Sequence, residues 1–456
     1  MLTAADFDAL RAREFARLDE AGEVYLDYTG SAIPAASLLA RHQRQIERAI
    51  LGNPHSAHAA SRRSTALIAD ARAAVLEFFG ASASTHAVCF TANASAAIKL
   101  VAESYPFGPR RGLVLAADNH NSVNGMREFA RRAGAPTRYL PLDDELRLED
   151  PVEHLRASVA GGGLLAFPAQ SNFSGVEHSL SLVETARVLG FEVLLDAAAF
   201  APTHPLDLGV CPADFVVVSF YKMFGYPTGV GALIARRGAL ATLRRPWFAG
   251  GTIDFVSVQN DRHELRAGED AFEDGTPNFA AIGAVAAGLE LLRDLGMNAI
   301  HARVRELTAS LLGALLELRH PNGSPMVTIY GPRDACRRGG TIAFNLLDPS
   351  GRVRPYEPVE VDLSDRGIFV RGGCFCNPGA AEAAFHFDAG VEARCLSGLE
   401  GRFTVARFAD CLGPDVAVGA LRASIGVATT LADLARAVAA LSDIARVRAI
   451  DCVPAP

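Results

Sequence analysis

Short apolar runs alternate with longer amphipathic segments over residues 86–290. Each run ends in a small or polar residue and is followed by helical periodicity, which is typical of parallel strands joined by crossover helices. The predicted strands are His86–Phe90, Gly112–Ala116, Leu164–Pro168, Glu192–Asp196, Phe215–Ser219 and Gly231–Ala235. The pattern therefore predicts an α/β domain with a mostly parallel sheet, in which ligands bind beyond the carboxyl ends of the strands.

The pattern changes near residue 280. One long helical periodicity runs from residue 280 to about 318, followed by strand-like pieces at Val327–Tyr330 and Thr341–Leu347 and a final helix near Leu431–Ser442. These elements, with an amphipathic N-terminal helix, predict a smaller α/β layer. We expect a large domain over residues 25–290 and a small domain that combines residues 291–456 with residues 1–24.

Composition narrows the class of protein. Half of the 456 residues are hydrophobic and the net charge is -7, so the chain lacks the basic field that binds nucleic acid. The longest uncharged stretches, residues 78–98 and 157–176, are interrupted by Gly, Ser and Asn and do not predict a membrane span. The charged N-terminus does not resemble a signal peptide. We expect a cytoplasmic protein with mostly reduced cysteines and a small-molecule substrate.

Candidate chemistry follows the predicted strands. Asn93, Ala94 and Ser95 open a helix after the first strand, where free backbone N–H groups suit either a phosphate or simple capping. Asp196 ends the fourth strand and would either cap a helix or pair with a protonated ring nitrogen. Lys222 follows the fifth strand, among aromatic residues and glycines that would lower its pKa and favour a nucleophilic amine.

Lysine is scarce in this chain. The sequence contains only Lys99 and Lys222, and Lys99 lies within a predicted helix among Ala, Ile and Leu. Lys222 is therefore the better candidate for a Schiff-base amine. A surface role is the alternative for any lysine, but this chain uses arginine for its other permanently basic positions.

A glycine-bounded loop, Arg-Gly-Gly-Cys-Phe-Cys-Asn-Pro-Gly from Arg371, carries two thiols. A zinc site needs further Cys or His residues at ligand spacing, and no second pair follows. We therefore expect no metal. Cys374 and Cys376 remain as either ordinary loop cysteines or a catalytic thiolate.

Together these segments resemble the class V aminotransferase-like, fold-type I enzymes that use pyridoxal 5'-phosphate (PLP), and within them the cysteine-desulfurase-like domain of molybdenum cofactor sulfurases. The resemblance runs from residue 25 to about 438. The motifs that carry it are Gly52-Asn-Pro-His-Ser, Phe90-Thr-Ala-Asn, Asn119-His-Asn-Ser-Val, Pro168-Ala-Gln-Ser-Asn-Phe-Ser-Gly, Leu195-Asp-Ala-Ala-Ala-Phe, Ser219-Phe-Tyr-Lys-Met-Phe-Gly, Phe272-Glu-Asp-Gly-Thr and Gly373-Cys-Phe-Cys-Asn-Pro-Gly-Ala.

The resemblance implies a fold-type I PLP-dependent transferase fold and a homodimer with cofactor sites at its interface. Lys222 would form the Schiff base and move protons, Asp196 would pair with the pyridinium, and His120 would stack on the ring. Thr276 would reach the phosphate from the neighbouring subunit. The expected cofactor-binding residues are Asn93, Ala94, Ser95, His120, Asn172, Asp196, Ser219, Tyr221, Lys222 and Thr276.

The resemblance also implies a reaction. Arg422 would grip the carboxylate of L-cysteine, and Arg371, Asn53 and His55 complete the expected substrate-binding set. Lys222 would remove the α-proton, and the Cys376 thiolate would attack the substrate sulfur, leaving L-alanine and a persulfide. Arg371 would supply positive charge that favours the thiolate.

The sequence departs from the pattern of many relatives. Ala199 stands where they place Gln, and Tyr221 stands where they place His immediately before the lysine. Molybdenum cofactor sulfurases typically carry a further C-terminal domain, whereas this sequence ends at Pro456, so we expect a separate sulfur-acceptor protein. Two alternatives stay open: a lyase, epimerase or aminotransferase acting on another amino acid, and a binding protein that has lost its chemistry.

Overall fold

The computed structural model describes residues 3–158, 162–399, 401–413 and 416–446, and in them a seven-stranded sheet has the order β2-β8-β7-β6-β5-β3-β4. Its strands are β2 (His86–Thr91), β3 (Gly112–Ala116), β4 (Thr137–Leu140), β5 (Gly163–Pro168), β6 (Phe191–Asp196), β7 (Phe215–Ser219) and β8 (Gly231–Arg236). The six predicted strands are confirmed, and β4, which the hydrophobic pattern missed, adds an edge. The sheet is mostly parallel, but β8 runs antiparallel to both β2 and β7.

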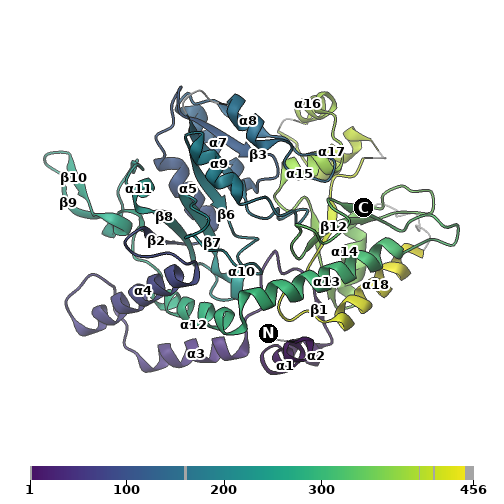
Figure 1. Cartoon of the computed structure of the whole chain (residues 1–456), viewed down its shortest axis with the longest axis horizontal. Coiled ribbons are helices and arrows are strands. Elements are labelled where there is room, and N and C mark those ends of the chain that lie inside the picture. Colours follow the sequence, from purple (N-terminus) through teal and green to yellow (C-terminus); the bar gives the residue numbers. More distant parts are fainter. Residues whose placement is uncertain (1–2, 159–161, 400, 414–415, 447–456) are drawn as a thin grey trace.

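The strands bury both faces, and alternate side chains enter different cores. Val216 and Val218 of β7 pack with α4 (Ala59–Phe78), α9 (Ser181–Val188) and α12 (Phe279–Leu295), whereas Val217 packs with α5 (Ala94–Ser104) and α7 (Met126–Arg132). The result is a three-layer arrangement with helices on both faces of the sheet (Figure 1). This architecture brings the carboxyl ends of the parallel strands to one edge.

The prediction of one long helix from residue 280 to 318 is wrong in one respect, because two helices occupy this segment. The helix α12 ends at Leu295, and α13 (Met297–Glu317) begins after Gly296. Gly296 has φ 80° and ψ 114°, a conformation that breaks the helical hydrogen-bond ladder and that glycine adopts without a steric penalty. The break lets α12 stay on the large sheet while α13 extends to the second sheet (Figure 1).

The second sheet is antiparallel and has the order β11-β12-β15-β14. Its strands are β11 (Val327–Tyr330), β12 (Thr341–Leu346), β14 (Arg371–Gly373) and β15 (Ala420–Ser424). The two strand-like pieces predicted here are confirmed. Because β14 and β15 are neighbours, Arg371 lies directly opposite Arg422. A short parallel pair of β1 (Val24–Tyr25) and β13 (Ile368–Phe369) joins the N-terminal segment to this part of the molecule. The domain boundary at residue 290 stays a prediction.

Further elements surround the two sheets. They are α1 (Ala4–Glu14), α2 (Arg17–Ala21), α3 (Ala36–Arg48), α6 (Asn121–Asn124), α8 (Pro151–Ser158), α10 (Phe220–Phe224), α11 (Arg237–Leu240), α14 (Tyr356–Asp365), α15 (Pro378–Ala384), α16 (Ala389–Gly398), α17 (Val405–Leu412), α18 (Leu431–Arg446) and the hairpin β9 (Ile253–Ser257) with β10 (Arg262–Leu265). The predicted N-terminal and final helices are confirmed. Within the described ranges, no helix has the length and apolar character needed to cross a bilayer.

The cysteines are not all in the expected state. Cys395 and Cys411 form a disulfide that joins α16 to α17, so the expected reduced thiols are not found at this pair. Five others, including Cys374 and Cys376, are free thiols. Cys452 lies outside the described residues. No group of three or more His, Cys, Asp or Glu side chains suited to a metal ion occurs among the residues with described positions.

Candidate active site

The start of α5 meets the end of β7. The backbone N–H of Ala94 donates to Ser219 Oγ at 2.9 Å, and Asn93 caps the same helix by accepting from the Ala96 N–H at 2.9 Å. Gly231 permits this close approach, since a Cβ there would lie 2.6 Å from the Asn93 backbone. Ser95 Oγ lies 2.6 Å from Ser122 Oγ. These contacts gather hydroxyls and helix-terminal N–H groups, which suit an anionic group such as a phosphate.

Lys222 lies on α10, three residues beyond the end of β7. Its side chain is half-buried, and burial lowers the pKa of its ammonium group while nearby Asp196 opposes that effect. Among the described residues, Lys222 Nζ makes no hydrogen bond or ion pair. A lysine with these properties retains a free amine that can react with a carbonyl group.

Asp196 ends β6, and His120 follows β3, which is separated from β6 in the sheet by β5 alone. Asp196 is buried at the end of β6, and its Oδ1 accepts from the Ala198 N–H at 2.9 Å, so Oδ2 is left for a cationic partner. His120 caps α6, its Nδ1 accepting from the Ser122 N–H at 3.1 Å. Burial lowers the pKa of His120, as do the charges of Lys222 and Arg422, whereas Asp196 raises it. His120 is therefore a neutral imidazole near pH 7, with its proton on Nε2.

The thiol loop is tied to the same edge of the sheet. The Asn121 N–H donates to the carbonyl of Cys376 at 2.7 Å, and Asn172 Nδ2 donates to the carbonyl of Phe375 at 2.7 Å. Asn377 is fully buried, and its Nδ2 donates to Asn172 Oδ1 and to the Asp118 carbonyl. These bonds fix the backbone of the loop beside His120. Asn172, expected to contact the cofactor, also supports this loop.

The loop exposes both of its thiols. Phe375 and Cys376 each have φ 55°, so two consecutive non-glycine residues adopt the left-handed conformation. That conformation costs about 1–2 kcal/mol per residue and persists only where surrounding contacts enforce it. The Phe375 ring is buried, while the side chains of Cys374 and Cys376 are exposed. The turn thus buries the aromatic ring between two accessible sulfur atoms.

Arg422 and Arg371 share one carboxylate. Arg422 is only 2% exposed, and its Nη2 donates to Asp27 Oδ1 at 2.8 Å while its Nη1 donates to the Asn172 carbonyl at 3.0 Å. Arg371 donates to both oxygens of Asp27, with its Nη2 at 2.6 Å from Oδ2. Burial lowers the pKa of Arg422, and the bond to Asp27 raises that of Arg371. The two arginines expected to bind substrate are thus organised by a third residue.

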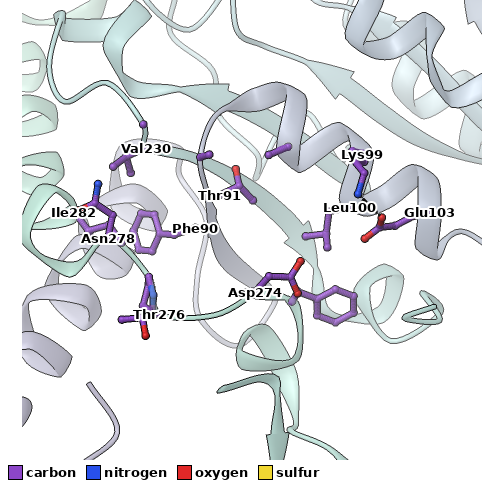
Figure 2. Close-up of a pocket in the computed structure, with 15 residues that line it drawn as sticks. Phe90, Thr91, Lys99, Leu100, Glu103, Val230, Asp274, Thr276, Asn278 and Ile282 are labelled. Carbon is purple, nitrogen blue, oxygen red and sulfur yellow. Dashed lines mark hydrogen bonds and ion pairs between the residues drawn. The ribbon is translucent and has the colours of Figure 1, made fainter. Parts of the chain in front are cut away.

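Three expected site residues lie together elsewhere. Asn53 Nδ2 donates to Thr276 Oγ1 at 3.3 Å, and His55 lies 3.2 Å from Arg266 Nη1. Within the described part of the single chain, no hydrogen bond or ion pair joins these residues to Lys222 or Arg422. Thr276 borders a pocket of about 370 Å³ (Figure 2). Their assignment to the cofactor or substrate stays a prediction, which for Thr276 involves the neighbouring subunit.

The hydrophobic pattern and strand ends did not point to Asp27 and Asn377. Asp27 stands in the Tyr-Leu-Asp-Tyr segment where the resemblance begins, yet nothing local distinguishes it from other acidic residues. Asn377 precedes Pro378 at the start of α15, and Asn followed by Pro is a helix-start signal. That signal identifies a cap, but it does not reveal the two buried bonds.

Replacing Asn377 with alanine is expected to lower the free energy of unfolding by roughly 2–4 kcal/mol, because α15 loses its cap and two buried acceptors lose their donor. Chemical denaturation measures this change. Asp388→Ala is the matched control, since Asp388 is an exposed cap of α16 and its loss should cost only about 1 kcal/mol. Equal losses for the two variants would contradict the anchoring role of Asn377.

Comparisons with known proteins agree with the geometry. The family model described as aminotransferase class-V matches residues 24–436. The chain is 35% identical over 409 residues to a molybdenum cofactor sulfurase of Solanum lycopersicum, covering 82% of this chain and 50% of the relative. It is 38% identical over 402 residues to that of Bos taurus, covering 82% and 45%. The chain thus spans about half the length of these curated relatives.

Solved structures share the fold. A cysteine desulfurase from Thermococcus onnurineus NA1 superposes with a TM-score of 0.79 at 24% identity, covering 98% of this chain and 99% of that chain. A cysteine desulfurase from Escherichia coli gives a TM-score of 0.76 at 23% identity, covering 98% of each chain. At these identities the likeness establishes the fold type, and the expected fold-type I architecture is confirmed.

Proposed function

Since the chain belongs to the aminotransferase class V family, we propose that it is a PLP-dependent cysteine desulfurase-like sulfurtransferase. In this proposal it converts L-cysteine to L-alanine and keeps the sulfur as a persulfide on Cys376. The observation that carries the proposal is the bond from the Asn121 N–H to the Cys376 carbonyl, which ties the backbone of a residue with a free, exposed thiol to the residue that follows His120.

The residues present fit PLP. Lys222 offers an uncommitted amine, Asp196 leaves Oδ2 for a ring nitrogen, and Ser219 and the start of α5 supply donors for a phosphate. Residue 231 must be glycine, because any Cβ there would collide with the backbone of Asn93, next to the expected phosphate site. When bound, PLP supplies an electron sink for the substrate α-carbon.

The residues of the chain divide the remaining work. Arg422 binds the substrate carboxylate through its guanidinium N–H groups. Lys222 Nζ takes the proton from the α-carbon and returns a proton as alanine forms. Neutral His120 provides a flat ring and an N–H at Nε2 without adding charge to the site. Asp196 would hold the ring nitrogen of bound PLP in its protonated form by charge.

Cys376 carries the sulfur transfer. Its thiolate attacks the substrate sulfur, so that a sulfur–sulfur bond forms as the carbon–sulfur bond breaks. The electron pair of the broken bond stays with carbon, which is then protonated. The sum is L-cysteine plus a thiol giving L-alanine plus a persulfide, and no external oxidant is required.

The proposal predicts that the PLP-loaded protein releases alanine from L-cysteine and gains protein-bound sulfur in equal amounts until Cys376 is fully converted. Amino-acid analysis and mass spectrometry of the intact protein measure the two products. Addition of a thiol reductant should remove the bound sulfur and restore turnover.

Other products would contradict the sulfurtransferase function. Free sulfide or pyruvate without bound sulfur would indicate a lyase instead. Turnover of another amino acid alone would indicate an aminotransferase or epimerase.

We further infer a homodimer, a cytoplasmic location and a separate sulfur-acceptor protein. Exposed apolar side chains support the dimer: Phe255 and Val258 on the β9–β10 hairpin segment and nearby Trp247 are 60%, 96% and 51% exposed. Thr276 lines a pocket and has no hydrogen bond to Lys222 among the described residues, which is consistent with a site completed by a second copy. Molybdenum cofactor maturation is the route that the names of the sequence relatives favour.

A further inference from the structure

Asp27 is shared unequally between two arginines. Arg371 approaches it with Nε at 3.1 and 3.0 Å from the two carboxylate oxygens and Nη2 at 2.6 Å from Oδ2, whereas Arg422 contacts only Oδ1, at 2.8 Å. A Cβ on Gly30 would lie 2.5 Å from Asp27 Oδ2 and 2.8 Å from Arg371 Nη2. The absence of a side chain at residue 30 therefore lets the carboxylate and Arg371 close on each other.

The three side chains carry one uncompensated positive charge, because two guanidinium groups face one carboxylate. Arg371 is about half exposed, so solvent screens it, but Arg422 is buried and stands over the Phe375 ring at 4.8 Å. Arg422 Nε has no hydrogen-bond partner among the described residues. The buried arginine thus keeps both unsatisfied charge and an unused N–H group.

We propose that Asp27 and Arg371 tune the affinity of Arg422 for the substrate carboxylate. Arg371 makes three of the four contacts with Asp27, so the carboxylate neutralises Arg371 more than it neutralises Arg422. More of the positive charge of Arg422 is therefore available to attract the incoming anion. This inference rests on the proposed function, in which Arg422 is the carboxylate-binding residue. Asp27 and Arg371 are positioning residues in this scheme, since they act through Arg422.

If Asp27 is shared in this way, replacing Asp27 and replacing Arg371 should change the affinity for L-alanine in opposite directions. Asp27→Asn removes the competing anion, so binding of L-alanine to the PLP-loaded protein should tighten about fivefold. Arg371→Met leaves Asp27 wholly to Arg422, so binding of L-alanine should weaken about fivefold. Calorimetric titration measures both affinities without requiring turnover or Cys376.

L-alaninamide, which lacks the negative charge, is the matched probe. Its affinity should change less than twofold in either variant. Arg371→Lys, which keeps the charge, should retain the L-alanine affinity of the unaltered protein. If Asp27→Asn fails to fold, the contrast between Arg371→Met and Arg371→Lys still tests the charge, because a purely steric role would make both variants weak.

The outcomes separate the two proposals. Weaker L-alanine binding in both Asp27→Asn and Arg371→Met would overturn charge sharing and indicate that the pair only supports the fold. Equal binding of L-alanine and L-alaninamide to the unaltered protein would overturn the role of Arg422 and charge sharing with it. Failure of the desulfuration assay with intact selectivity for L-alanine would overturn the reaction alone and leave charge sharing supported.

Discussion

Replacing Lys222 with alanine is expected to lower the rate of alanine formation from L-cysteine by about 10³-fold or more. In the proposed function, the variant loses the amine that attaches the cofactor and the group that moves the α-proton. No neighbouring amine can substitute, because Lys99 is the only other lysine in the chain. Amino-acid analysis measures the rate, and borohydride reduction followed by mass spectrometry should show the cofactor fixed on Lys222 in the unaltered protein and on no lysine in the variant.

Lys99→Ala is the matched control for this experiment. Lys99 is exposed on α5 and forms an ion pair with Glu103 at 2.7 Å. Its loss should leave both the reduced adduct and the rate of alanine formation within about twofold, because an exposed ion pair contributes little. Cofactor fixed on Lys99, or an unchanged rate in Lys222→Ala, would show that Lys222 is not the attachment residue.

Replacing Cys376 with serine is expected to abolish protein-bound sulfur and to lower alanine formation from L-cysteine by about 10³-fold or more. A serine hydroxyl stays protonated near pH 7 and does not attack sulfur as a thiolate does. The reduced adduct on Lys222 should remain, because no hydrogen bond or ion pair joins Cys376 to the amine of Lys222 among the described residues. Mass spectrometry reports both the persulfide and the adduct.

Cys374→Ser provides a close comparison. Cys374 is two residues away on the same loop and is equally a free, exposed thiol. It should retain persulfide formation on Cys376. The opposite pattern, with sulfur lost only in Cys374→Ser, would move the nucleophile to Cys374, and loss in both variants would indicate that the sulfur passes between the two thiols.

The fold was largely predictable because buried strands leave a strong local pattern. The segments that end at Asp196 and Ser219 are continuous apolar runs, and the rule that ligands bind beyond such strands led directly to Asp196 and Lys222, whereas Ser219 itself was identified through the resemblance. Direction was not predictable in the same way. The antiparallel β8 has the same apolar pattern as the parallel strands of the sheet, because hydrophobicity records burial and carries no information about strand direction.

The contacts at the arginines were beyond the reach of local pattern. Asp27 is 344 residues from Arg371 and 395 residues from Arg422 in sequence. The pairing of β14 with β15 brings the two arginines together, and a bridge from Asp27 to Ser424 of β15 adds the carboxylate. Asn377 presents the same difficulty, since its partners lie on loops after β3 and β5. The resemblance identified the arginines by position, but the shared carboxylate emerges only from the folded chain.

The anchored loop also bears on how sulfur would leave the enzyme. The carbonyl of Cys376 accepts a hydrogen bond from the Asn121 N–H. The next residue, Asn377, is buried and its side chain donates to both Asp118 and Asn172. A persulfide on Cys376 would therefore travel no farther than its own side chain permits. Handover then depends on an acceptor that fits the surface around the thiol, so the selectivity of delivery would reside in docking and not in a swinging arm.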